Sequence, residues 1–164
     1  MPQARLGDAA WLNEAPVARL LALLDRDGEE ARVVGGAVRN ALLGLPVAEI
    51  DVATTALPAE VMRRVTAAGC KAVPTGIEHG TVTVIIEHQP VEVTTLRQDV
   101  ETFGRKARVA FGRDWRADAE RRDFTINALS ASADGMVHDY VGGLADIAVR
   151  RVRFIGDARK RIEE

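Results

Sequence analysis

The chain has 164 residues, of which 47% are hydrophobic and 28% are charged, a balance typical of one ordinary globular domain. Its net charge of −2 excludes a global positive field that would attract nucleic acid. The single cysteine, Cys70, excludes an internal disulfide and a cysteine-rich zinc site.

The N-terminal region is predicted to supply one packing helix and no chemistry. Residues 1–14 contain no basic start followed by an apolar run, and no stretch of the whole chain approaches the length of a membrane span. We therefore expect no membrane partner and, with a single cysteine, a cytoplasmic location. Residues 14–26 place apolar side chains at helical spacing, which predicts the packing helix.

Residues 31–55 combine a buried strand, a glycine pair and a helix start. The strand is predicted over Ala31–Val34, Gly35 and Gly36 follow it, and a helix is expected over Ala37–Leu43. Glycines at such a junction let backbone N–H groups approach an anion closely, and the helix dipole favours negative charge there. The pattern predicts a phosphate-binding site, although a glycine pair at a strand end is also an ordinary turn.

A second strand is expected over residues 49–54, with acidic side chains at alternate positions. Glu49 and Asp51 are two residues apart, so a strand would carry both carboxylates on one face. Neighbouring carboxylates repel unless a cation joins them, and hard oxygen ligands beside a phosphate site suit Mg²⁺. The pair predicts a metal-assisted phosphoryl or nucleotidyl transfer site; the alternative is a solvated acidic face.

The next predicted elements are a helix over residues 58–68, an edge strand over 71–73 and a hairpin of strands 81–87 and 91–96. Glu92 lies on the second hairpin strand, and its two valine neighbours point to the opposite face. If that strand pairs with the one that carries Asp51, Glu92 becomes a third carboxylate of the site. The alternative is an exposed glutamate without a special role.

Residues 98–116 are dense in charge and have no clear period, which predicts a mobile loop. The remaining expected elements are a polar helix beginning over 118–127, a strand over 136–140, a helix over 144–149 and another helix from Asp157. Two basic runs, at 105–116 and 150–161, are either solvated faces or a path for an RNA backbone.

Three stretches, in this order, resemble one family. VVGGAVRN followed by EID is similar to the GGxVRD and DxD motifs of bacterial-type (class II) tRNA nucleotidyltransferases and poly(A) polymerases. RRDFTINA and VHDYVGGLADI are similar to two further motifs of that family. The resemblance implies a polymerase-β-like nucleotidyltransferase fold, an α/β (α+β) arrangement of a mixed, mostly antiparallel sheet with flanking helices. It also implies a catalytic head over 31–155 and the start of a neck helix over 156–164.

The same resemblance implies roles for individual residues. Glu49, Asp51 and Glu92 match the family's catalytic acidic positions, which hold Mg²⁺ in a two-metal site. The residues that match nucleotide-binding positions are Gly35, Gly36, Arg39, Arg122, Asp123 and Asn127. Because adjacent helical residues point about 100° apart, only one of Arg121 and Arg122 is expected to face the nucleotide.

Two positions depart from the family pattern. Glu49 stands where an aspartate is usual, and its extra methylene can shift a bound metal by more than the tolerance of about 0.5 Å for a preorganised site. Asn40 replaces the aspartate that closes GGxVRD. We expect Glu49 to remain a ligand and Asn40 to support its neighbours. The neck residues that choose between CTP and ATP in the family are expected beyond residue 164.

The sequence thus predicts the head of a metal-dependent RNA nucleotidyltransferase that transfers CMP or AMP from CTP or ATP to an RNA 3′-hydroxyl. Addition or repair of the tRNA 3′-CCA end is the preferred role. A poly(A) polymerase or an A-adding enzyme is the closest alternative, because it has the same head motifs. A catalytically impaired RNA- or nucleotide-binding module is the second, because of Glu49 and Asn40. The third alternative is a purely structural α/β domain, which would have no affinity for nucleotides.

Overall fold

A computed structural model describes residues 4–6, 12, 15–101 and 107–155. Its helices are α2 (Ala15–Leu24), α3 (Gly36–Leu43), α4 (Pro58–Ala67), α5 (Trp115–Glu120) and α6 (Gly143–Ala148), and its 3₁₀ turns are η1 (Ile77–His79) and η2 (Thr125–Asn127). Its strands are β1 (Ala4–Arg5), β2 (Ala31–Val34), β3 (Asp51–Thr54), β4 (Lys71–Gly76), β5 (Thr81–Ile86), β6 (Gln89–Thr95), β7 (Arg97–Glu101), β8 (Ala107–Phe111), β9 (Ser130–Ala131) and β10 (Met136–His138). The predicted neck helix from Asp157 lies outside the described residues.

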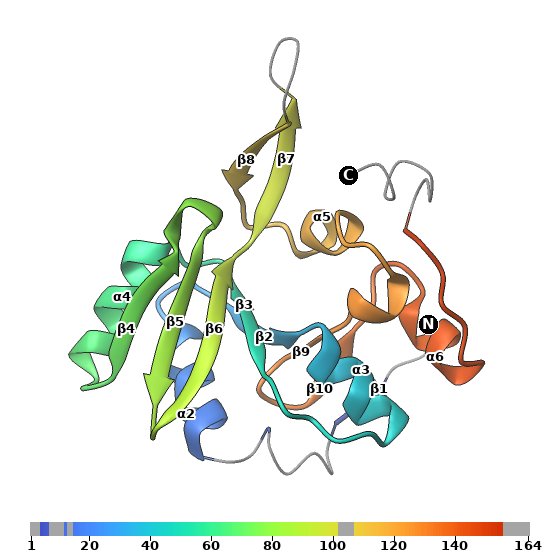
Figure 1. The fold of residues 1–164 in the computed structure, drawn as a ribbon, viewed down its shortest axis with the longest axis horizontal. Coiled ribbons are helices and arrows are strands. Elements are labelled where there is room, and N and C mark those ends of the chain that lie inside the picture. Colours follow the sequence, from blue (N-terminus) through green and yellow to red (C-terminus); the bar gives the residue numbers. More distant parts are fainter. Residues whose placement is uncertain (1–3, 7–11, 13–14, 102–106, 156–164) are drawn as a thin grey trace.

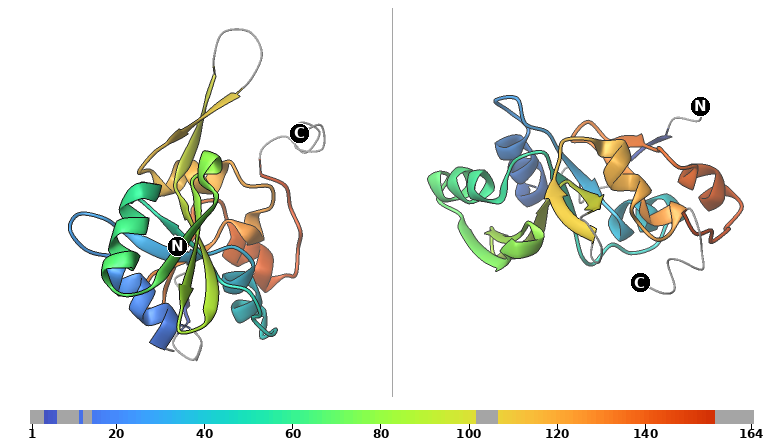
Figure 2. Two further views of the ribbon diagram at one scale, coloured as in Figure 1. Left: turned by 60° about the vertical axis from the view of Figure 1, so that its left-hand side comes forward. Right: turned by 90° about the horizontal axis from the view of Figure 1, so that it is seen from above.

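Eight strands form one mixed sheet, in the order β1-β10-β9-β2-β3-β6-β5-β4. β3 and β6 pair in parallel, whereas the other pairs of this sheet are antiparallel. β7 and β8 form a separate antiparallel ribbon that projects from the sheet (Figure 1; Figure 2, left). The predicted mixed, mostly antiparallel sheet is confirmed, and β3 lies beside the strand that carries Glu92.

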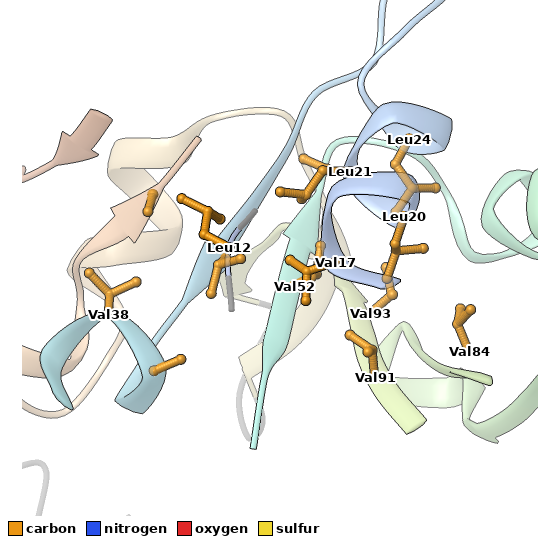
Figure 3. Close-up of a cluster of buried hydrophobic side chains, with 14 of the residues drawn as sticks. Leu12, Val17, Leu20, Leu21, Leu24, Val38, Val52, Val84, Val91 and Val93 are labelled. Carbon is orange, nitrogen blue, oxygen red and sulfur yellow. The ribbon is translucent and has the colours of Figure 1, made fainter. Parts of the chain in front are cut away.

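One face of the sheet is covered by α2, α3 and α4, and the main hydrophobic core lies between them. Leu20 and Leu21 of α2 are fully buried in a cluster with Val52 and Val93 of the two central strands (Figure 3). Side chains alternate along a strand, so the residues next to these two valines point to the opposite face. Asp51 and Glu92 therefore project from the face that these helices leave uncovered.

That second face carries a smaller cluster. Val34 of β2 and Ala53 of β3 pack there with Leu96, and Trp115 of α5 packs against them. The short helix α5 thus lies on the same face as the predicted carboxylates, next to the central strands. Its position makes it a wall of the site described below.

The strand predicted over residues 49–54 begins only at Asp51. β2 ends at Val34, which pairs with Asp51, and Gly35 then turns the chain away into α3. Residues before Asp51 therefore have no β2 partner. The prediction that Glu49 and Asp51 share one strand face was wrong, and Glu49 reaches the site from the preceding segment.

Two further segments, 98–116 and 118–127, have a secondary structure that differs from the prediction. The described part of 98–116 is not a plain loop, because it forms most of the β7–β8 ribbon and the start of α5. The helix expected over 118–127 ends at Glu120. Phe124 is extended and forms a β-bridge with Phe154, and this pairing replaces a further helical turn.

In the described part of the chain, no helix combines the length and the apolar character that crossing a bilayer requires.

Candidate active site

Two of the three predicted carboxylates lie side by side on neighbouring strands. Asp51 is the first residue of β3, and Glu92 is its register partner on the parallel strand β6. Both side chains are exposed, as is Glu49. All three residues line a cavity of about 500 Å³, whose wall also includes Thr83 and Gln89 of the β5–β6 hairpin. The structure therefore brings the three predicted acids to one cavity.

The charge on Asp51 is opposed by its surroundings. Loss of hydration at the cavity wall raises the pKa of the Asp51 carboxyl, and the negative charges of Glu92 and Glu49 raise it further. The positive charge of Arg122 acts in the opposite direction. A cation placed between these carboxylates would remove the repulsion that raises this pKa.

The donor set suits a hard divalent cation such as Mg²⁺, because it consists of carboxylate oxygens, beside the glycine junction that begins α3. Among the described residues, no three acidic, histidine or cysteine side chains converge closely enough to hold a metal ion. The binding of such a cation would therefore depend first on Asp51 and Glu92, whose relative position is fixed by the pairing of β3 with β6. Glu49 belongs to the irregular segment 45–50, so no strand pairing fixes its position relative to them.

The glycine pair ends β2 and begins α3, as predicted. Gly35 has φ 74° and ψ −137°, a conformation that favours glycine, and Gly36 is the first residue of α3. A second cavity, of about 260 Å³, is lined by Gly36, Arg39, Glu49 and Asp51. The helix N-terminus and Arg39 thus provide positive charge beside the acids, an arrangement that can bind a phosphate group.

Arg39 is held by two amide side chains. Its Nη1 donates to Asn127 Oδ1 at 2.7 Å, and its Nε donates to Asn40 Oδ1 at 3.0 Å. Asn40 Nδ2 in turn donates to the carbonyl of Pro46, in the segment that leads to Glu49. Two predicted site residues, Arg39 and Asn127, are therefore in direct contact. Asn40 links them to the acidic segment, in agreement with the expected supporting role.

Asp118 of α5 holds both arginines of the RRDFTINA motif. It is buried, with 4% of its surface exposed, and its two oxygens accept from Arg121 Nη2 at 3.1 Å and Arg122 Nη2 at 2.9 Å. Sequence reasoning missed this residue. Its signal is the spacing of an acid three and four residues before two arginines, which on a helix places all three on neighbouring positions.

These arginines lie beside the carboxylates rather than on opposite sides of a helix. A third cavity, of about 140 Å³, is lined by both arginines and by Gly35, Asp51 and Glu92. The expectation that only one arginine faces the nucleotide assumed a continuous helix, but α5 ends at Glu120. Both guanidinium groups are therefore near the site.

Asp123 is not brought to this site in the same way. It is exposed, its carboxylate accepts the N–H of Phe124 at 2.7 Å, and its carbonyl accepts the N–H of Ile155 at 2.8 Å. It lines none of the three cavities described above. Its visible role is to shape the turn between α5 and η2.

Comparison with known proteins places these motifs in context. The family model described as the poly A polymerase head domain matches residues 31–153. The mitochondrial CCA tRNA nucleotidyltransferase 1 of Mus musculus is 44% identical over 146 residues, which cover 88% of this chain and 34% of that protein. The CCA-adding enzyme of Bacillus cytotoxicus is 42% identical over 147 residues, or 88% of this chain and 36% of that protein. The chain thus spans about a third of the length of these curated relatives.

Solved structures of CCA-adding enzymes and tRNA nucleotidyltransferases are also similar to this chain. The Bacillus stearothermophilus CCA-adding enzyme in complex with CTP superposes with a TM-score of 0.80 at 37% identity, covering 90% of this chain and 35% of that one. A tRNA nucleotidyltransferase complexed with a primer tRNA and an incoming ATP analog superposes with a TM-score of 0.67 at 29% identity, covering 84% and 39%.

Proposed function

Because the chain belongs to the poly A polymerase head domain family, we propose that it is the catalytic head of an RNA nucleotidyltransferase that adds or repairs the 3′-CCA end of tRNA. The family predicted from its motifs is confirmed, and its fold is the polymerase-β-like nucleotidyltransferase fold. The observation that carries the proposal is the pairing of Asp51 with Glu92 beside the Gly35–Gly36 junction and Arg39. Acids and phosphate-binding groups share one site.

The triphosphate of CTP or ATP would bind on the side of α3. Gly36 and Arg39 line the 260 Å³ cavity there, and Asn127 fixes Arg39 through its 2.7 Å hydrogen bond. Arg122 would add positive charge from the 140 Å³ cavity, which it lines together with Gly35 and which shares Asp51 with the first. Asp123 would act indirectly, by shaping the turn that carries Arg122.

The acidic side chains would bind and orient the reacting groups. Asp51 and Glu92, joined by Glu49, are the residues that would hold Mg²⁺. When bound there, the ions would lower the pKa of the RNA 3′-hydroxyl and stabilise the leaving pyrophosphate. The chain contributes by fixing the carboxylates on adjacent strands, so that little reorganisation is needed during the reaction.

The choice of CTP, ATP and tRNA as substrates is supported by relatives. One solved relative is a CCA-adding enzyme in complex with CTP, and another is bound to a primer tRNA and an ATP analog. A poly(A) polymerase or A-adding enzyme remains the alternative within the same family. For the impaired binding module, the contacts of Asn40 argue against a lost catalytic group, since Asn40 supports Arg39.

We also propose the domain arrangement expected from the sequence, with an N-terminal helix within 1–30, a head over 31–155 and a neck that begins in 156–164. The cytoplasmic location stays a prediction, because relatives include mitochondrial enzymes.

The decisive experiment incubates the complete protein with tRNA that lacks its CCA end, Mg²⁺ and labelled CTP or ATP, and resolves products at single-nucleotide resolution. Stepwise addition of C, C and A is the expected result. A run of A alone would replace the proposal with the poly(A) or A-adding alternative. Nucleotide binding without incorporation would leave the binding module as the function.

A further inference from the structure

Arg32 is a buried arginine whose contacts the reaction described above does not use. It lies on β2 with 6% of its surface exposed, on the same face as Val34. Its Nη2 donates to Glu30 Oε2 at 2.8 Å, and its Nη1 donates to Tyr140 Oη at 2.9 Å and to Ser130 Oγ at 3.4 Å. One guanidinium thus joins β2, β9 and the segment before α6.

The same guanidinium supports the start of α5. Its Cζ lies 4.1 Å from the centroid of the Trp115 ring, a cation–π contact in a buried setting. The indole Nε1 of Trp115 is buried without a hydrogen-bond partner among the described residues. The orientation of Trp115, the first residue of α5, therefore depends on packing, and Arg32 supplies one of its surfaces.

α5 connects this contact to the nucleotide side of the site. Trp115 and Asp118 are three residues apart and so lie on the same side of the helix. Asp118 fixes Arg121 and Arg122, and the cavity beneath them also contains Asp51. A shift of Trp115 would therefore move both arginines relative to the carboxylates.

We propose that Arg32 is a positioning residue for the nucleoside triphosphate, because it sets the position of α5 and thereby that of Arg122. This inference rests on the proposed function, since it assigns Arg122 to the triphosphate. Arg32 itself touches no reacting group. Its contribution is the placement of a second residue whose charge must lie within reach of the phosphates.

Arg64 provides a matched control. It is equally buried, at 4% exposure, and its Nη1 donates to the carbonyls of Leu23, Leu24 and Arg26 at the end of α2. It lies on α4, which covers the other face of the sheet. Arg32→Met and Arg64→Met each remove one buried guanidinium, so both variants should lose thermal stability.

The experiment measures the affinity for CTP with Mg²⁺, and KM and kcat for incorporation, in the complete protein. Arg32→Met is expected to lower kcat/KM by about tenfold to 100-fold, mainly through KM, as displaced positioning groups do. Arg32→Lys should recover part of the loss. Arg64→Met should leave the CTP affinity and KM within about twofold of the wild type, the scale of change expected when no positioning group moves.

A double-mutant cycle tests the route through Arg122. In an Arg122→Met background, Arg32→Met should have little further effect on CTP affinity, because the group that it positions is gone. Additive effects, or equal KM changes for Arg32→Met and Arg64→Met, would overturn the inference.

Failure of the proposed function is distinguishable from failure of this inference. If the wild type binds CTP but incorporates nothing, the function fails while the cycle still decides the role of Arg32. If the wild type does not bind CTP, both proposals fall.

Discussion

At Asp51, the requirements of stability and of the proposed chemistry oppose each other. Loss of hydration and the charges of Glu92 and Glu49 raise the pKa of its carboxyl above the usual 3.8. A carboxyl with a raised pKa in the folded state costs stability once it ionises. The cost is absent below pH 3.8 and increases as the pH rises through the folded-state pKa. At neutral pH the folded protein therefore carries a destabilising charge that a cation would compensate.

Asp51→Asn should raise the free energy of unfolding at pH 7 in the absence of metal, while it abolishes incorporation. Activity should fall by more than about 100-fold, because metal-assisted charge stabilisation is worth several kcal/mol and each 1.4 kcal/mol is tenfold. Denaturant unfolding with and without Mg²⁺ measures both effects. Mg²⁺ should stabilise the wild type and leave the variant unchanged; stabilisation of both to the same extent would refute the assignment of Asp51 as a ligand.

Glu49 differs from Asp51 in that no strand register fixes it. Because residues 45–50 are irregular, the backbone can adjust to a side chain that is one methylene shorter. Glu49→Asp should keep activity within about tenfold of the wild type, whereas Glu49→Gln should lose more because it removes a charged donor. Steady-state incorporation at several Mg²⁺ concentrations checks this. If Gln were tolerated as well as Asp, Glu49 would not be a metal ligand.

At the scale of elements, the sequence predicted those with a clear hydrophobic period. β2, α4 and the β5–β6 hairpin follow the expected bounds closely. α4 and the hairpin each have one buried face that their apolar spacing reveals, and β2 is a short run that is buried on both faces and ends at a glycine pair. The β7–β8 ribbon was missed because it stands away from the sheet and its sequence shows no such period (Figure 1). The end of α5 was missed because it is set by pairing with Phe154, thirty residues beyond Phe124.

In the candidate site, too, some features could be predicted from the sequence and others could not. The pairing of Asp51 with Glu92 was predicted correctly as a condition on strand order, and the parallel register fulfils it. The role of Asp118 was not predicted, although its spacing to Arg121 and Arg122 is a signal of contact, because the sequence does not tell that this acid is buried. Site residues on strands, such as Asp51 and Glu92, are thus easier to predict than a residue such as Asp118. Its helix, α5, packs against strands that are far away in the sequence.

The end of the β7–β8 ribbon lies against Gly80, the residue that precedes β5. Gly80 has φ +84°, and a Cβ placed on it would lie 2.6 Å from Cε1 of Phe111, the last residue of β8. Gly28 has nearly the same φ of +83°, but a Cβ placed on it would meet no atom within 4 Å. A substitution at Gly28 therefore introduces backbone strain alone, whereas a substitution at Gly80 introduces the same strain and a steric clash with Phe111.

Gly80→Ala should destabilise the protein by about 2–4 kcal/mol, and Gly28→Ala by about 1–2 kcal/mol, since only the first adds overpacking to the strain. Denaturant unfolding at pH 7 measures both. Adding Phe111→Ala to Gly80→Ala should remove most of the difference. Equal losses in the two single variants would show that Phe111 does not hold the ribbon at this point.

For the whole molecule, two exposed arginines of the first basic run bond to distant segments of the chain. Arg113 bonds to Glu29 and to the carbonyl of Gly28, and Arg116 donates to the carbonyl of Tyr140 and lies over its ring. Arg150 and Arg151 are exposed. Arg113 and Arg116 thus join distant segments of the chain while they remain exposed, so the prediction that the first run is a solvated face or a path for RNA stays a prediction.

The C-terminal end of the described chain is joined to η2 and to Phe124, which precedes it. The N–H of Thr125 donates to the carbonyl of Arg153 at 3.0 Å, and the Phe124 and Phe154 rings are 4.7 Å apart. Asp146 of α6 accepts from the Thr125 hydroxyl at 2.5 Å and from Arg153 Nε at 3.0 Å. One buried carboxylate thus holds the C-terminal segment against η2, which carries Asn127.

Asp146→Asn should destabilise the protein at pH 7 by about 1–2 kcal/mol, a value reduced from that of a buried ion pair because Arg153 is partly exposed. Burial alone would raise the pKa of Asp146, but the Thr125 hydroxyl and the Arg153 guanidinium outweigh it and lower the pKa below 3.8. The stabilisation is therefore complete above pH 3.8 and is lost as the pH falls through the folded-state pKa. Unfolding curves from pH 7 to pH 2 should show the wild type and the variant converging at the acid end. The exposed Glu87→Gln serves as the control, with little change at any pH; a difference for Asp146→Asn that stays constant down to pH 2 would show that its charge has no part in holding the two segments together.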